Sequence, residues 1–131
     1  MIMLDTNVVV AFLNGDKSIL KRIRAEVGKI TLNTLVTAEL DYGAKASQRA
    51  KENLEKLYRL VDVCQVIPFD VECAKVFGTI KSRLRSLGKP TGEMDGLIAA
   101  TAMAHKATLA TADIKHFENI EGLKLEAWPT K

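Results

Sequence analysis

The apolar and polar residues of this chain form two alternating patterns: short apolar runs, and longer stretches with one apolar stripe. The first run, residues 1–4, is entirely apolar and stops at Asp5. Such a run predicts a strand that is buried on both faces, as strands of a parallel sheet are. Similar runs predict four further strands, at residues 29–32, 63–67, 107–111 and, at the edge of the sheet, 123–126.

Between these runs, apolar residues recur every three or four positions, which predicts helices. The predicted helices cover residues 8–13, 17–27, 35–46, 48–60, 71–87 and 93–105, with a short helical turn at 114–117. Strands that alternate with helices imply right-handed βαβ units and a sheet covered on both faces. We therefore predict a three-layer α/β/α fold whose central, mostly parallel sheet has four to five strands.

Length and composition add broad limits. A chain of 131 residues is long enough for a core that needs no disulfide, so we predict one domain over residues 1–131. No apolar run approaches the roughly 18 residues of a membrane helix, and no signal peptide is visible. Cys64 and Cys73 lack metal-ligand spacing, so we expect buried thiols in a reducing cytoplasm. The net charge of +3 is compatible with a nucleic-acid partner without establishing one.

Four acidic residues have apolar or small neighbours instead of a charged, solvated surround: Asp5, Glu39, Asp95 and Asp113. Asp5 and Asp113 each follow a predicted strand, and Glu39 lies in the first turns of the helix after another. Helices after parallel strands begin at the carboxyl edge of the sheet, where α/β proteins bind ligands. We therefore expect these three carboxylates at one edge.

Asp95 is harder to place. Its helix precedes the strand at 107–111, so we expect that helix to begin at the amino edge of the sheet. The alternative is that the long helix before it and the loop at 88–92 return the chain to the carboxyl edge. Helical spacing puts Asp95 on one face with Ile98 and Ala99, which turns its carboxylate inward. No lysine or arginine lies near it on that face, and burying an unpaired charge is costly. A divalent cation shared with other carboxylates would compensate the charge of Asp95, and clustered carboxylates suit Mg²⁺ or Mn²⁺.

Each of these residues also has a simpler interpretation. Asp5 and Asp113 stand where helix caps are common, and capping alone explains either one at least as well. Glu39 is compatible with an exposed position on its helix. His105 and His116 are expected to be single, unpaired surface residues.

Four segments taken together resemble the PIN domains, and most closely the VapC toxins of prokaryotic toxin–antitoxin pairs. They are Met-Leu-Asp-Thr-Asn (3–7), Thr-Ala-Glu-Leu-Asp-Tyr-Gly (37–43), Gly-Glu-Met-Asp-Gly-Leu-Ile-Ala-Ala (92–100) and Ala-Thr-Leu-Ala-Thr-Ala-Asp (107–113). Each motif alone is weakly specific, but all four occur in the family's order across essentially the whole chain, with a matching segment around Trp128. The resemblance implies the PIN fold, which brings Asp95 to the carboxyl edge.

The resemblance also implies a metal-dependent RNA endonuclease. Its catalytic and metal-binding residues would be Asp5, Glu39, Asp95 and Asp113, with Mg²⁺ as the metal and Mn²⁺ as the alternative. A structured RNA, such as tRNA or rRNA, is the implied substrate, and a cognate antitoxin that inserts a segment at the acidic site is the implied inhibitor. A homodimer is implied too, with the apolar positions of the helices at 35–57 as contact surface.

Residues around the acids are assigned smaller roles. Thr111 matches the family's common Thr or Ser, and we expect Thr6, Asn7 and Thr111 to support the acidic site. Thr91 stands where the family usually has an apolar residue, and Ala112 where Asn is frequent. The predicted rim for the RNA backbone comprises Lys81, Arg83, Arg85, Lys89 and Lys115, with His116 beside them; an ordinary solvated helix surface is the alternative.

Other functions fit the sequence less well. A dehalogenase-type phosphotransferase has a second Asp two residues after the first, where this chain has Asn7. A receiver domain needs its phosphoacceptor after the third strand, where this chain has Pro68 and Phe69. A catalytically silent module, whose acids only bind metal or a protein, remains the alternative to the nuclease.

Overall fold

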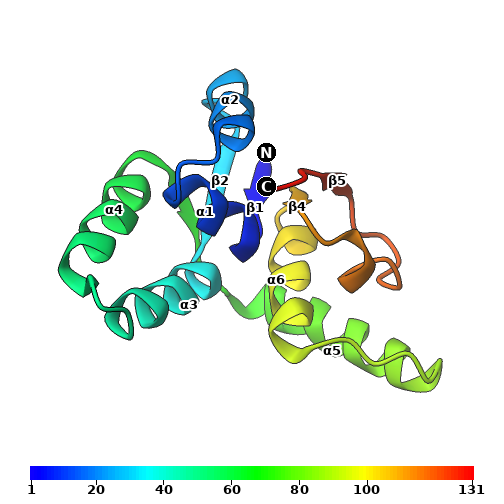
Figure 1. Ribbon diagram of the computed structural model, residues 1–131. Helices are drawn as coiled ribbons and strands as arrows, with labels where there is room; N and C mark the ends of the chain where they lie inside the picture. The colour runs from blue at the N-terminus through cyan, green and yellow to red at the C-terminus, as the bar shows by residue number, and fades with distance from the viewer.

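The computed structural model describes residues 1–131 and contains the predicted alternation of strands and helices (Figure 1). The strands are β1 (Ile2–Leu4), β2 (Ile30–Asn33), β3 (Gln65–Ile67), β4 (Thr108–Thr111) and β5 (Leu125–Ala127). They form one sheet in the order β3-β2-β1-β4-β5, and every neighbouring pair is parallel. The predicted α/β fold with a parallel sheet is therefore confirmed.

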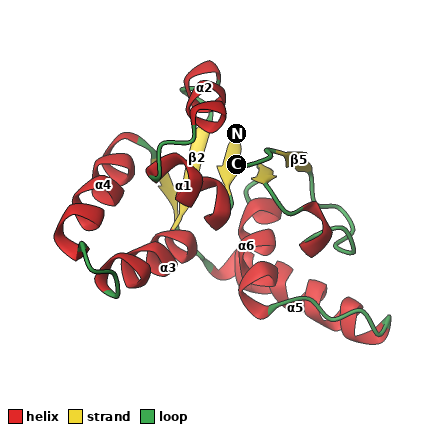
Figure 2. Cartoon of the chain, viewed as in Figure 1, coloured by secondary structure: helices red, strands yellow, loops and turns green.

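Six α-helices and one 3₁₀ turn surround this sheet (Figure 2). They are α1 (Thr6–Leu13), α2 (Lys17–Ala25), α3 (Thr34–Lys45), α4 (Ala50–Val63), α5 (Val71–Ser86), α6 (Glu93–Ala104) and η1 (Ile114–His116). Helices α3 and α4 pack together on one side of the molecule, and α5 and α6 on the other (Figure 1). None of the helices has the length and apolar content to span a bilayer.

Caps set several of the helix starts. The side chains of Asp5, Asn33 and Asp70 each accept a hydrogen bond from a backbone N–H in the first turn of α1, α3 and α5. Some predicted boundaries are wrong. The edge strand predicted at 123–126 is Leu125–Ala127, and the strand predicted at 63–67 is shorter, because Val63 belongs to the end of α4 and is 81% exposed. The strand consists only of the residues that pair with β2.

The central strand β1 is buried along its whole length. Met3 lies opposite Thr31 of β2 on one side and Leu109 of β4 on the other, and Met3 itself is fully buried. Along α6, small residues such as Ala99 and Ala102 are completely buried. Because β1 lies at the middle of the sheet, the residue that follows it, Asp5, is placed at the margin of the core.

The direction of α6 corrects one prediction. Strand β4 is parallel to β1, and at its beginning the Thr108 N–H donates to the Met1 carbonyl. Helix α6 leads directly into this strand, so it ends at the amino edge and begins at the carboxyl edge. Strand order alone suggests the amino edge, which is wrong because a helix before a parallel strand ends where that strand starts. The carboxyl edge, which the resemblance implies, is the one observed. Helix α5 brings the chain back to the carboxyl edge first, which places Asp95 there.

Candidate active site

Asp5 joins the central strand to α1, and both of its carboxylate oxygens accept a hydrogen bond. The Thr6 N–H donates to Oδ1 (2.9 Å) and the Thr111 hydroxyl donates to Oδ2 (2.8 Å). Burial raises the pKa of the Asp5 carboxyl, the charges of Asp95 and Glu39 raise it further, and the two hydrogen bonds oppose this. Asp5 is thus a helix cap and also a poorly compensated charge inside an acidic group.

Thr6 links Glu39 to Asp5, because its backbone N–H and its hydroxyl donate to the two carboxylates. The Thr6 hydroxyl donates to Glu39 Oε1 (2.7 Å), which connects the start of α1 to α3. On the other side of Asp5, the Asp113 N–H donates to the Thr111 hydroxyl (3.0 Å), and the Ala112 N–H donates to Asn7 Oδ1 (3.4 Å). Hydrogen bonds therefore connect the first strand and helix to α3 and to the turn after β4.

Asp95 and Asp113 share one partner, the imidazole of His116. Its Nδ1 lies 3.3 Å from Asp95 Oδ2, and its Nε2 lies 3.0 Å from Asp113 Oδ2. Burial raises the pKa of Asp95, His116 opposes this, and the charges of Glu39 and Asp113 add to the increase. The carboxylates of Glu39 in α3, Asp95 in α6 and Asp113 in the turn after β4 therefore act on one another.

This geometry corrects two predictions. His116 is exposed, as expected, but it is not unpaired, and Asp95 does have a basic neighbour. The neighbour comes from another segment of the chain, so no residue spacing within α6 indicates it. The three-residue spacing of Asp113 and His116 is the signal in the sequence that would have suggested their contact.

A cavity of about 800 Å³ opens beside these side chains. Asp5, Glu39 and Asp95 line it, whereas Asp113 does not and is connected to it through His116. The four acids are gathered at one edge of the sheet but are not drawn within 4.8 Å of one another as a ligand set.

The basic residues of the cavity differ from the predicted rim. Lys17 and Lys131 line the cavity, and none of the predicted rim lysines and arginines does so. Within that rim, Lys81 pairs with Glu93 and Arg83 with Glu121.

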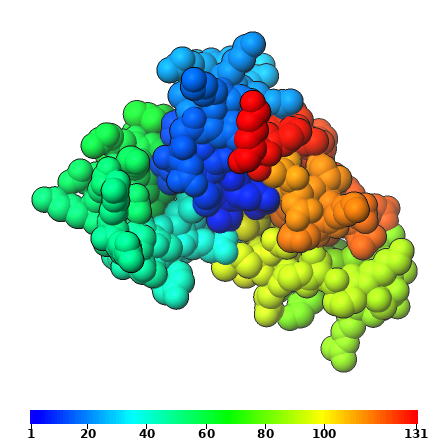
Figure 3. Space-filling view, viewed as in Figure 1, coloured from blue at the N-terminus to red at the C-terminus, as the bar shows by residue number.

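The C-terminal residue Lys131 reaches the cavity because the end of the chain lies against its N-terminal segment (Figure 3). The backbone N–H of Lys131 donates to Asp16 Oδ2 at the start of α2 (2.9 Å). Contact between the two ends of a chain has no local signature in the sequence.

His105 and the two cysteines also differ from expectation. His105 is half-buried, and its Nε2 lies 3.3 Å from Asp70 Oδ2, so it is neither exposed nor unpaired. Cys73 is buried as expected, but Cys64 is only half-buried.

Comparison with known proteins then identifies the family. A family model described as the PIN domain matches residues 2–123 of the chain. The chain belongs to the PIN-domain family. Two relatives of this PIN domain each align over 96% of both chains: Ribonuclease VapC2 of Rickettsia felis is 34% identical over 129 residues, and the tRNA(fMet)-specific endonuclease VapC of Shigella flexneri is 32% identical over 127.

Solved structures give the same assignment. The crystal structure of VapBC2 from Rickettsia felis bound to a DNA fragment from its promoter has a TM-score of 0.92 to this PIN domain. Its sequence is 34% identical, and the match covers 98% of this chain and 99% of that one. DNA-bound VapBC from Salmonella typhimurium has a TM-score of 0.93 at 27% identity, with 97% of both chains covered. The predicted PIN-domain endoribonuclease of the VapC type is thus confirmed.

Proposed function

We propose that this PIN domain cleaves RNA with Mg²⁺, or alternatively Mn²⁺, held by the carboxylates of Asp5, Glu39, Asp95 and Asp113. One observation carries the proposal: carboxylates from four separate segments gather at the carboxyl edge of the sheet, beside an open cavity. A phosphodiester would be repelled by such a group unless a cation lay between them.

The donor set fits a hard divalent cation. Its ligand atoms are carboxylate oxygens, which Mg²⁺ and Mn²⁺ prefer. Burial and neighbouring acids raise the pKa of both Asp5 and Asp95, so the protein alone compensates their charges poorly. When bound, such an ion neutralises charge on the reacting phosphate and lowers the pKa of a coordinated water.

The protein's own residues position the acids and the substrate. Thr111 holds Asp5 and the turn that carries Asp113, and Thr6 holds Glu39. His116 fixes the relative positions of Asp95 and Asp113. Lys17 and Lys131, which line the cavity, would bind phosphates of the RNA backbone.

We infer that the substrate is a structured RNA, such as a tRNA or an rRNA. One relative is named a tRNA(fMet)-specific endonuclease, which supports this class. Aromatic residues make up only 5% of the chain, so base stacking would contribute little and backbone contacts would contribute more.

The decisive experiment incubates the purified protein with tRNA and with rRNA fragments in Mg²⁺. Asp5→Asn removes one proposed ligand, and Asp62→Asn, at an exposed position on α4, is the matched control. We expect wild type and Asp62→Asn to cleave, and Asp5→Asn or EDTA to reduce cleavage about 100-fold or more. Cleavage that survives either treatment would contradict the metal–carboxylate site. Cleavage of no RNA tested would favour the silent binding module.

We also propose that an antitoxin neutralises this protein, since the structural relatives are VapBC complexes. The acidic cavity offers a site that a basic segment of a partner would fill. Expression of the chain alone should slow growth, and co-expression of its genomic neighbour should relieve the slowing. Failure of either result removes support for this proposal.

A homodimer through α3 and α4 is proposed as well. Leu57 is buried within the chain, so the apolar contact surface would be provided by Tyr42, which is 75% exposed, and Tyr58, which is 39% exposed. Light scattering should give a molar mass twice that of the chain, and Tyr42→Asp should shift this mass toward that of a single chain. A monomer at all concentrations would contradict the proposal.

A further inference from the structure

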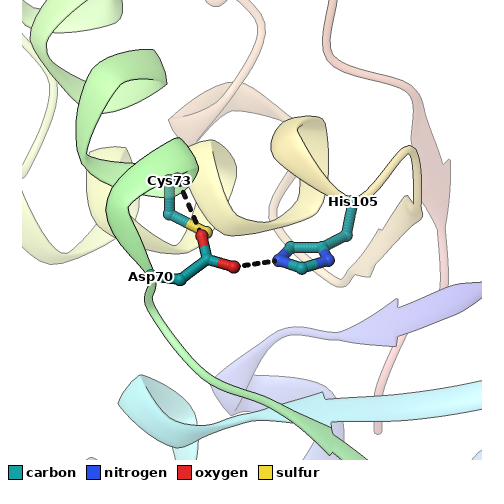
Figure 4. Close-up of side chains that lie close together, drawn as sticks. All are labelled: Asp70, Cys73 and His105. Atoms are coloured by element: carbon teal, nitrogen blue, oxygen red, sulfur yellow. Dashed lines mark hydrogen bonds and ion pairs between the residues drawn. The ribbon is translucent and has the colours of Figure 1, made fainter.

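A second group of metal-ligand side chains lies where α5 begins and α6 ends. Asp70 is the N-cap of α5, Cys73 lies in its first turn, and His105 is the C-cap of α6. One carboxylate oxygen, the sulfur and one imidazole nitrogen all lie within 4.8 Å of one another. Figure 4 shows the Asp70 carboxylate between the thiol of Cys73 and the imidazole of His105.

We propose that Asp70, Cys73 and His105 bind one Zn²⁺ ion. A set of one oxygen, one sulfur and one nitrogen ligand is typical of zinc, whereas Mg²⁺ does not use thiolates. The distance from His105 Nε2 to Asp70 Oδ2 is 3.3 Å. Two ligands that are each about 2.0 Å from a tetrahedral ion lie about 3.3 Å apart. Three protein ligands leave the fourth position to water.

Each donor atom is available for the ion. Asp70 Oδ1 caps α5 by accepting the Cys73 N–H, which leaves Oδ2 for the metal. Cys73 is fully buried, and its sulfur makes a weak 3.9 Å contact with the Pro68 carbonyl.

His105 provides the strongest argument. Its Nε2 is shielded from solvent, and its one polar neighbour is the Asp70 carboxylate 3.3 Å away, which forms an ion pair only when the imidazole is protonated, so the neutral imidazole leaves this nitrogen without a hydrogen bond. A buried polar atom without a partner costs about 1–3 kcal/mol, and the large majority of such atoms are satisfied. A bond from this nitrogen to a metal would satisfy it.

The charges of the cluster balance around a divalent cation. One carboxylate, one thiolate and one neutral imidazole give a neutral complex with Zn²⁺. The C-terminus of α6 favours a cation beside His105, and the N-terminus of α5 partly opposes it. Burial raises the pKa of the Cys73 thiol, so zinc would bind by displacing the thiol proton.

The cluster is separate from the acidic cavity. Asp95 lies in the first turn of α6 and His105 follows its last turn, so about 15 Å of helix separates them. A zinc ion here would crosslink the start of α5 to the end of α6, at the end of the helix pair that has no connecting loop. Its expected effect is on stability, and it does not depend on how the acidic cavity works.

Cobalt provides a selective probe, because a thiolate bound to Co²⁺ gives a near-ultraviolet charge-transfer band that a carboxylate site cannot produce. The full chain, stripped with a chelator, is titrated with Co²⁺ and then with Zn²⁺. We expect one thiolate-bound Co²⁺ per chain, displaced by Zn²⁺, and loss of the band in Cys73→Ser and His105→Gln. Cys64→Ser and Asp95→Asn should keep the band. A folded wild type without the band, or a band that survives His105→Gln or disappears in Cys64→Ser, would overturn the site.

Thermal unfolding gives a second, independent measurement. Saturating Zn²⁺ should raise the unfolding midpoint of wild type and Cys64→Ser by roughly 5–10 °C, and leave His105→Gln unchanged. Circular dichroism without metal checks that each variant folds; if Cys73→Ser does not, His105→Gln decides alone. Equal shifts in wild type and His105→Gln would mean that Asp70 and His105 form only an ion pair.

Discussion

The imidazole of His116 lies between two carboxylates, 3.3 Å from Asp95 Oδ2 and 3.0 Å from Asp113 Oδ2. The two acids come from different segments, α6 and the turn after β4, so this histidine fixes their separation. Its own backbone is held in turn, because the Thr91 hydroxyl donates to the His116 carbonyl (3.0 Å). Thr91, in the loop before α6, therefore holds the backbone of the turn that carries His116.

His116→Ala should lower kcat/KM for RNA cleavage about 10–100-fold, since residues that orient metal ligands have effects of that size. The acids would remain but lose the group that positions them. His105→Gln, at the far end of α6, is the control and should cleave like wild type. Wild-type cleavage by His116→Ala would show that the bridge has no part in the reaction.

Thr111 connects two of the acids, so its hydroxyl should matter for stability and for cleavage. Thr111→Val removes the donor to Asp5 and the acceptor for the Asp113 N–H, and should lower the free energy of unfolding by about 1–3 kcal/mol. Cleavage should fall with it. Thr101→Val is the matched control: Thr101 is equally buried, and its hydroxyl donates to the Leu97 carbonyl within α6 and to none of the four acids. Equal effects of both changes on cleavage would contradict a specific role.

The elements of this fold were predictable because their signals are local. Apolar runs mark the strands, and capping residues such as Asp70 mark helix starts. Val63 was misplaced because a β-branched residue before a strand fits either element, and pairing with β2 decides which residues form the strand.

The candidate site was predictable only in part. Asp5 and Asp113 follow strands, so strand order alone places them at one edge, whereas Asp95 depends on the direction of α6. The contacts of His116 and Lys131 depend on segments that meet only after folding, and no sequence spacing between Lys131 and Asp16 signals their contact.

The raised pKa of Asp5 has a defined effect on stability. A carboxyl whose pKa is higher in the folded than in the unfolded protein binds protons more tightly when folded. Without metal, the free energy of unfolding should therefore fall as pH rises from the ordinary Asp value of 3.8 through the folded-state pKa. Asp5→Asn should raise the unfolding midpoint of the metal-free protein at pH 7 by about 2–5 °C and weaken this pH dependence.

Asp16 provides a control of opposite sign. Hydrogen bonds, first from the Lys131 N–H and then from Ser18, lower the pKa of its carboxyl, so it stabilises the fold above its ordinary pKa. That stability is lost as pH falls through the folded-state pKa. Asp16→Asn should therefore lower the midpoint at pH 7. A lower midpoint in Asp5→Asn as well would show that Asp5 is not a poorly compensated charge.

Gly96 should be needed for the packing of α6 against α5. A Cβ added there would lie 3.1 Å from Phe77 Cε1, which is too close unless the ring moves. Gly96→Ala should therefore lower the free energy of unfolding by about 1 kcal/mol. Gly43→Ala, in the interior of α3 with no atom within 4 Å of the added Cβ, should raise it by about 0.5–1 kcal/mol. Chemical denaturation measures both, and a gain at both positions would contradict the close packing.

Lys17 is the residue that best distinguishes the observed cavity from the predicted RNA rim. It lines the acidic cavity, whereas Lys89 and Lys115 do not. If RNA passes over this cavity, Lys17→Ala should raise KM several-fold, leave kcat nearly unchanged and reduce the salt slope of binding by about 1. Lys29→Ala, at the amino edge before β2, is the matched control and should bind normally. A normal KM in Lys17→Ala, together with a raised KM in Lys89→Ala or Lys115→Ala, would show that RNA binds at the rim predicted from the sequence and not over this cavity.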